Sequence, residues 1–122
     1  MATAQAHDFK VGALRLDHPY ATPSQQGTAL LCFREIRNNG AQADHLRAAS
    51  ASVAQQVLAP EGQALPLVLP AGAAQRWRHD NGNCLRLQGL AKPLAAGERF
   101  EAILNFEKAG EARVNVWVQQ PR

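Results

Sequence analysis

The stretch from residue 99 to residue 118, RFEAILNFEKAGEARVNVWV, decides the fold class of this chain. Apolar side chains occupy every second position in both of its halves: Phe100, Ala102, Leu104 and Phe106, then Val114, Val116 and Val118. Side chains two positions apart in a strand lie on one face, so each half is predicted to be a strand with one buried face. Residues 107–111 between them contain Gly110, which can adopt a left-handed conformation, and predict a hairpin connection.

The same alternation continues outward from this stretch. In residues 84–88, Leu85 and Leu87 are predicted to face the core, while Cys84 and Arg86 share the opposite face. Further strands are predicted at 11–16, ended by His18-Pro19; at 28–37, ended by Asn38-Asn39-Gly40; and, more briefly, at 45–49, 53–58 and 65–69. Pro66 marks the last of these as an edge strand or an irregular segment.

Strands at this spacing, separated by turn residues, indicate a β-sandwich or a Greek-key barrel. Of these we predict an all-β, Ig-like Greek-key β-sandwich of about seven or eight strands. The 122 residues, of which 46% are hydrophobic and 19% charged, suffice for one domain with a packed core. We expect this single domain to cover residues 9–120 and residues 1–8 to be an N-terminal tail.

Composition and motifs exclude several classes of function. The net charge is +3, but the basic residues are spread along the chain without a stripe or a motif for nucleic acid. No apolar run approaches the roughly 20 residues of a membrane span. A Gly-x-Ser-x-Gly elbow, a phosphate-binding glycine loop and paired carboxylates are all missing from the sequence, so we do not expect an enzyme.

The N-terminus indicates export. Ala2-Thr3-Ala4 and Ala4-Gln5-Ala6 both fit the small-x-small pattern that precedes signal-peptidase cleavage, although the charged and apolar parts of a signal peptide are not present in this chain. We therefore expect residues 1–8 to be the remnant next to a cleavage site of a periplasmic protein. An ordinary alanine-rich tail is the alternative.

Several short motifs occur in a distinctive order: HDFKVG at 7–12, LDHPYA at 16–21, a strand with an Asn-x-Gly turn at 33–40, DHL at 44–46, PAG at 70–72, and Gly89-Leu90, Pro93-Leu94, Gly97 and FEKAG at 106–110. Together they resemble the bacterial periplasmic copper-chaperone (PCuAC) family over nearly the whole chain. This resemblance implies a cupredoxin-like β-sandwich and a role in copper handling.

The resemblance also implies where copper would bind. In that family a His and a Met, together with a His-x-Met pair just before the Gly-Leu, hold copper(I), for which thioether and imidazole are suitably soft ligands. Here Cys84 and Arg86 stand at the His-x-Met positions, and Pro60 falls near the first His. Met1 is the only methionine. The usual site is therefore absent.

His7 is the first remaining candidate ligand. Cleavage after Ala6 would give it a terminal amine that could chelate copper(II) together with its imidazole, and His18 could add a third nitrogen. Residues 1–6 prevent this chelate while they remain attached. Six extended residues span about 20 Å, so His18 joins only if the tail folds back. An N-terminal histidine without a role is the alternative.

Cys84 with His79 is the second candidate. A thiolate binds copper(I) well, and the loop at 80–83 could bring His79 toward the sulfur. Arg86, on the same face as Cys84, would place a positive charge beside the metal. The alternatives for Cys84 are a disulfide with Cys32 or a buried thiol.

These observations favour a periplasmic accessory protein of copper handling that is not an enzyme. It would either carry copper at a non-standard site or bind a copper-handling or oxidase-assembly partner. The alternative is a structural or protein-interaction module of the same fold that has lost its metal site. Trp117 alternates with the inward valines and is predicted to face outward, where it could form a contact surface.

Overall fold

The computed structural model describes residues 8–120, which form ten β-strands and a short 3-10 helix. The strands are β1 (Asp8–Val11), β2 (Leu14–Ala21), β3 (Thr28–Asn38), β4 (Asp44–Ala51), β5 (Ala54–Leu58), β6 (Leu67–Leu69), β7 (Ala74–Trp77), β8 (Leu85–Leu90), β9 (Arg99–Phe106) and β10 (Gly110–Val118); the helix η1 is Pro60–Gly62. Among these residues, no helix is long and apolar enough to cross a membrane.

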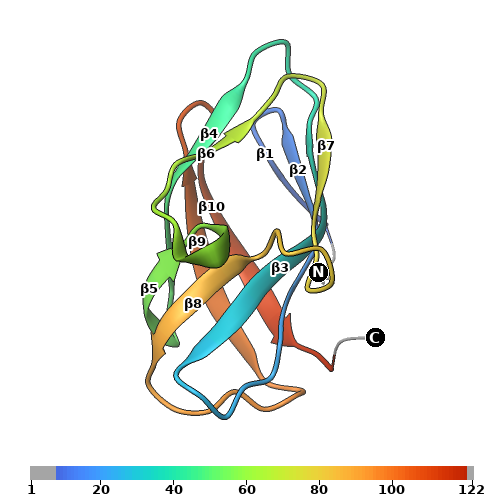
Figure 1. The fold of residues 1–122 in the computed structure, drawn as a ribbon. Helices are drawn as coiled ribbons and strands as arrows, with labels where there is room; N and C mark the ends of the chain where they lie inside the picture. The colour runs from blue at the N-terminus through green and yellow to red at the C-terminus, as the bar shows by residue number, and fades with distance from the viewer. Residues whose placement is uncertain (1–7, 121–122) are drawn as a thin grey trace.

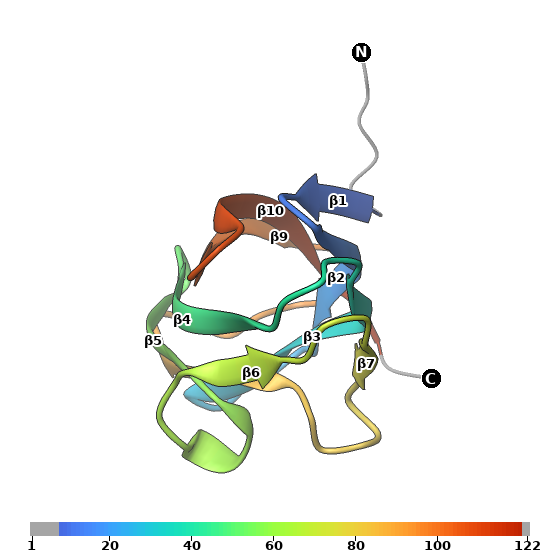
Figure 2. The same ribbon diagram turned by 90° about the horizontal axis from the view of Figure 1, so that it is seen from above.

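The strands make one continuous sheet that curls on itself. Its order is β5-β8-β3-β2-β10-β9-β4-β6, with β1 added beside β2 and β7 beside β3. The two halves join where the ends of β2 and β10 pair in parallel, Trp117 with Tyr20 and Val118 with Ala21. In Figures 1 and 2, β3 and β8 lie across the core from β9 and β10, so the curled sheet is a two-layer sandwich. The predicted all-β sandwich is confirmed.

The core is filled by the alternating side chains that the sequence singles out. At most 7% of the surface is exposed for each of the following residues: Leu85, Leu87, Phe100, Leu104, Phe106, Val114, Val116 and Val118. Trp117 points the other way and is 42% exposed, as predicted. Gly110 begins β10 at φ +91°, which confirms its left-handed position in the hairpin.

The predicted first strand is wrong in both of its limits. Residues 11–16 do not form one strand, because Gly12 adopts φ +54° and the chain reverses there, so that β1 pairs antiparallel with β2 and Asp8 lies opposite Asp17. Nor does His18-Pro19 end the strand. β3 pairs with β2 from Leu14 to Ala21, so the strand continues past that dipeptide although His18 itself adopts a positive φ.

The predicted edge strand agrees with the structure, whereas the predicted number of strands does not. β6 is the last strand of the order, which confirms the edge position predicted from Pro66. Sequence analysis missed β7, whose Trp77 is buried and packs edge-on against Phe33, with ring centroids 6.0 Å apart. This strand and the division at Gly12 raise the count from seven or eight to ten.

Candidate functional site

A disulfide links two neighbouring strands on the outer face of the sandwich. Cys32 in β3 and Cys84 just before β8 are bonded, with Cα atoms 4.7 Å apart. Both are buried and form a small cluster with Tyr20, which pairs with Cys32 across β2 and β3. Of the alternatives left open by the sequence, the structure shows the disulfide. The Cys84 sulfur is therefore not a thiolate ligand in this oxidised form.

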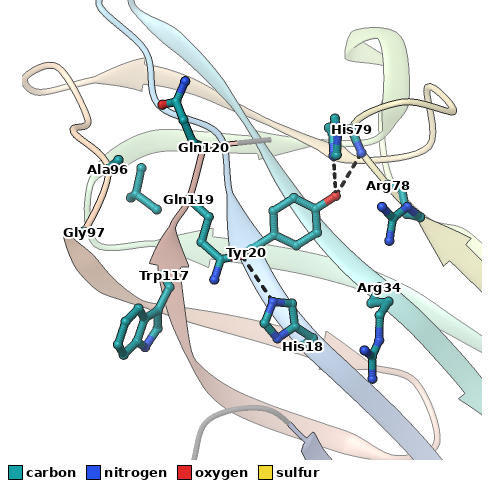
Figure 3. Close-up of a pocket in the computed structure, with 11 residues that line it drawn as sticks. His18, Tyr20, Arg34, Arg78, His79, Ala96, Gly97, Trp117, Gln119 and Gln120 are labelled. Carbon is teal, nitrogen blue, oxygen red and sulfur yellow. Dashed lines mark hydrogen bonds between the residues drawn. The ribbon is translucent and has the colours of Figure 1, made fainter. Parts of the chain in front are cut away.

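An open groove of about 570 Å³ lies directly over this cluster. It collects the polar and aromatic side chains of β2, β10 and the loop after β7, as Figure 3 shows. The side chains that the following argument uses are His18, Tyr20, Arg34, Arg78, His79 and Trp117. Tyr20 is only 5% exposed and separates the groove from the disulfide.

Tyr20 is fixed by the loop that follows β7. Its hydroxyl oxygen lies 2.8 Å from Nδ1 of His79 and accepts the backbone N–H of the same residue at 3.1 Å (Figure 3). The hydroxyl can accept the backbone N–H and still donate its own proton, and the tautomer of His79 sets which atom donates in the bond to Nδ1. Asn81 shapes this loop: its side chain accepts the N–H groups of Arg78 and Asn83. The loop thus holds His79 over the groove.

His18 lies on the other side of Tyr20. It adopts φ +53° inside β2, a backbone conformation that costs roughly 1–3 kcal/mol for a residue other than glycine. Nε2 of His18 lies 3.2 Å from Oε1 of Gln119, and the ring lies 6.0 Å from that of Tyr20. The surrounding strands hold a strained backbone that points an imidazole into the groove.

Basic side chains surround the groove. Arg34 donates two hydrogen bonds to Oδ2 of Asp17, at 2.8 and 3.0 Å, and Arg78 lies 3.5 Å from Asp80. Arg99 stacks over Trp117, with its guanidinium carbon 5.0 Å from the ring centroid. The three guanidinium groups and two carboxylates give these five side chains a net positive charge, which favours bound groups that carry negative charge.

Comparison with known proteins identifies the family. The family model described as "Putative lipoprotein LpqE-like" matches residues 14–118. This chain belongs to the LpqE-like family. A search of the curated proteins finds no match.

Solved PCuAC domains share the fold of this LpqE-like chain. The apo PCuAC domain from PmoF1 is 25% identical, with a TM-score of 0.84, covering 94% of this chain and 100% of that one. The copper-bound PCuAC domain from PmoF2 is 23% identical, with a TM-score of 0.85, covering 94% and 99%. CuI-DR1885 from Deinococcus radiodurans is 19% identical, with a TM-score of 0.66, covering 94% and 82%. The resemblance to the PCuAC family is confirmed.

The positions that the resemblance implies for copper carry other groups in the LpqE-like chain. Cys84 is bonded to Cys32. The guanidinium of Arg86 lies close to Gly62 of η1, so close that the Cβ atom of an alanine there would be 3.3 Å from Nη1. Pro60, near the expected first His, begins η1. A disulfide sulfur is a weak metal donor and a guanidinium is a cation with no lone pair to donate, so these residues do not fit a His/Met copper(I) site.

The four residues proposed as metal ligands are not gathered at one point. His18 and His79 share the groove on opposite sides of Tyr20, and Cys84 lies beneath it, whereas His7 is outside the described residues. Within residues 8–120 no three His, Cys, Asp or Glu side chains converge as metal ligands. The groove itself was missed because Tyr20 and Gln119 carry no sequence signal for it.

Proposed function

We propose that this chain is an exported, periplasmic accessory protein of copper handling, which carries or presents copper and catalyses no reaction. The supporting observation is its similarity to the PCuAC domain from PmoF1, at 25% identity and a TM-score of 0.84 over 94% of the chain. The lipoprotein description of its family is consistent with export. Copper is the cargo in this proposal.

The copper would not bind at the family's His/Met positions. Cys84 and Arg86 occupy the His-x-Met positions, and a disulfide beside a guanidinium offers copper(I) no soft donor pair. The oxidised chain should therefore lack tight copper(I) binding. A copper(I) competition assay that gave strong one-to-one binding surviving Cys84→Ser would contradict this.

The N-terminus is the alternative place for the metal. Processing after Ala6 would put an amine and an imidazole on His7, and the two nitrogens would then chelate copper(II) without gathering distant ligands. The reversal at Gly12 supports a contribution from His18, because it sets Asp8, which follows His7, opposite Asp17, which precedes His18. An unbroken strand over 11–16 would instead hold its two ends about 20 Å apart.

Copper(II) titration at neutral pH of two forms of the protein tests this function. The form beginning at His7 should bind at least about tenfold more tightly than the Met1 form, a difference of about 1.4 kcal/mol. Folding of both forms is checked by circular dichroism. Equal affinities would remove the N-terminal site.

The second candidate function is a protein-interaction module without metal. It is favoured by the disulfide and Arg86 at the family's ligand positions, and by Trp117, which is 42% exposed beside the groove and could meet a copper-handling or oxidase-assembly partner. This candidate would be favoured if neither the Met1 form nor the His7 form bound copper, whether oxidised or reduced.

A further inference from the structure

We propose that Cys32, Cys84 and His79 make a second copper site, specific for copper(I), which is closed while the disulfide is intact and opens when it is reduced. The inference rests on the proposed copper-handling function, but it is independent of the N-terminal site.

Reduction would leave two thiols side by side in a fixed frame. Cys32 lies in β3 and Cys84 directly before β8, with Cα atoms 4.7 Å apart and next to the paired residues Leu31 and Leu85. Two thiolates held at this separation can bind one copper(I) between them, and thiolate is among the softest ligands a protein offers. The backbone therefore preorganises both sulfurs without the bond.

His79 supplies the third ligand and controls access. The disulfide is covered by Tyr20, and both hydrogen bonds that hold the Tyr20 hydroxyl go to His79. His79 belongs to the loop that runs directly into Cys84, and positions 80–83 of this loop are exposed. Movement of this loop would uncover the sulfurs and bring the imidazole toward them at the same time.

The surrounding charge suits this site. Two thiolates, one copper(I) and a neutral imidazole carry a net charge of −1. Arg34 and Arg78 line the groove above, and Arg86 follows Cys84 on the same face of β8. These arginines would oppose a copper(I) ion held by neutral donors, but they stabilise a centre that is negative overall.

The opening step is thiol–disulfide exchange with a dithiol reductant. One thiolate of the reductant attacks a protein sulfur and forms a mixed disulfide, releasing the other cysteine; the second thiol of the reductant then breaks the mixed disulfide. Two electrons and two protons pass to Cys32 and Cys84, and the reductant leaves as its own disulfide. Copper(I) then replaces the two thiol protons, which go to solvent, and its oxidation state does not change.

The test is anaerobic competition for copper(I) between bicinchoninate, a chromophoric chelator, and the full chain. The protein is measured oxidised, and again after reduction with dithiothreitol and its removal. The reduced protein should take up one copper(I) per chain at least 100-fold more tightly than the oxidised protein. The Cys32→Ser/Cys84→Ser variant should bind no better than the oxidised protein. Equal uptake by the oxidised and reduced chains would overturn the inference.

Two histidine variants distinguish a site that includes His79 from copper(I) binding by the two thiols alone. In the reduced protein, His79→Ala should weaken copper(I) binding about tenfold, whereas His45→Ala, a control on β4 away from the cysteines, should have no effect. Circular dichroism establishes whether the reduced chain stays folded. If it unfolds, its thiols should bind copper(I) with equal affinity in both variants, and that equality overturns the inference.

The two copper experiments fail independently. Tight copper(II) binding by the oxidised His7 form, with no copper(I) uptake after reduction, would sustain the proposed function and overturn this site. Copper(I) uptake by the reduced Met1 form, with no gain in copper(II) affinity when the chain begins at His7, would sustain this site and remove the N-terminal one.

Discussion

The carboxylate of Asp44 accepts the backbone N–H of Lys108 at 2.8 Å, although the two residues are 64 positions apart. The same carboxylate accepts the N–H groups of Ala109 at 2.9 Å and of His45 at 2.7 Å. Asp44 is 3% exposed, and it ties the start of β4 to the hairpin between β9 and β10. One buried side chain therefore fixes the turn on which the C-terminal hairpin depends.

Replacing this carboxylate should destabilise the domain. Asp44→Asn puts an NH2 group against backbone N–H donors, so at least one part-buried donor loses its acceptor, at a cost of about 1–3 kcal/mol. Urea unfolding at neutral pH measures the loss. Asp80→Asn, in an exposed loop, is the matched control and should change stability by less than about 0.5 kcal/mol. A cost for Asp44→Asn no larger than the control's would contradict this.

The difference in stability between the wild-type protein and Asp44→Asn should depend on pH. Burial raises the pKa of Asp44, but the N–H groups of Lys108, His45 and Ala109 outweigh it and leave the pKa below its ordinary value. A lowered pKa adds stability above the ordinary value, and this stability is lost as pH falls through the folded-state pKa. The stability difference between wild type and Asp44→Asn should therefore shrink below about pH 4. A difference that grew on acidification would contradict the assignment.

Leu104 tests the core facing of β9. Its side chain is fully buried, so Leu104→Ala should cost about 2–5 kcal/mol through lost burial and the cavity left behind. The neighbouring Asn105 faces solvent, and Asn105→Ala should cost less than about 0.5 kcal/mol. Denaturant unfolding compares the two, and a loss below about 1 kcal/mol for Leu104→Ala would mean that the facing is wrong.

Gly12 tests the reversal between β1 and β2. Alanine there would adopt φ +54° and bring its Cβ to 2.9 Å from Cα of Ala109, so Gly12→Ala should destabilise the domain by roughly 1–3 kcal/mol. Gly27 has no such φ and no atom within 4 Å of a built Cβ, so Gly27→Ala should be neutral or slightly stabilising. Thermal unfolding decides, and equal stability of the two variants would count against a required left-handed turn.

Substitution of His18, on β2, tests whether this residue contributes to the proposed N-terminal copper(II) site. In the protein beginning at His7, His18→Ala should lower copper(II) affinity about tenfold, or about 1.4 kcal/mol, if the folded-back hairpin adds a third nitrogen. His45→Ala, whose imidazole pairs with Glu107, is the control and should leave the affinity unchanged. Unchanged binding by His18→Ala would restrict the chelate to His7 alone.

The sequence by itself determined the strands whose one face is apolar. The alternation of residue types alone places Leu104 and Val116 in the core, because a period of two follows directly from strand geometry and needs no partner. It also determined the departure from the family's copper ligands, since residue identities at Cys84 and Arg86 are visible in the chain alone. The short β7 was missed because four residues show too little periodicity, and its pairing with β3 decides its conformation.

Only the tertiary structure decided which distant residues meet. The turn at Gly12 lies against Ala109, almost a hundred positions later, and the pairing of Cys32 with Cys84 depends on β3 and β8 being neighbours. The groove is likewise assembled from Tyr20, His79 and the end of β10. Local patterns cannot encode these contacts, because a strand's alternation fixes which face is buried but not which strand lies beside it.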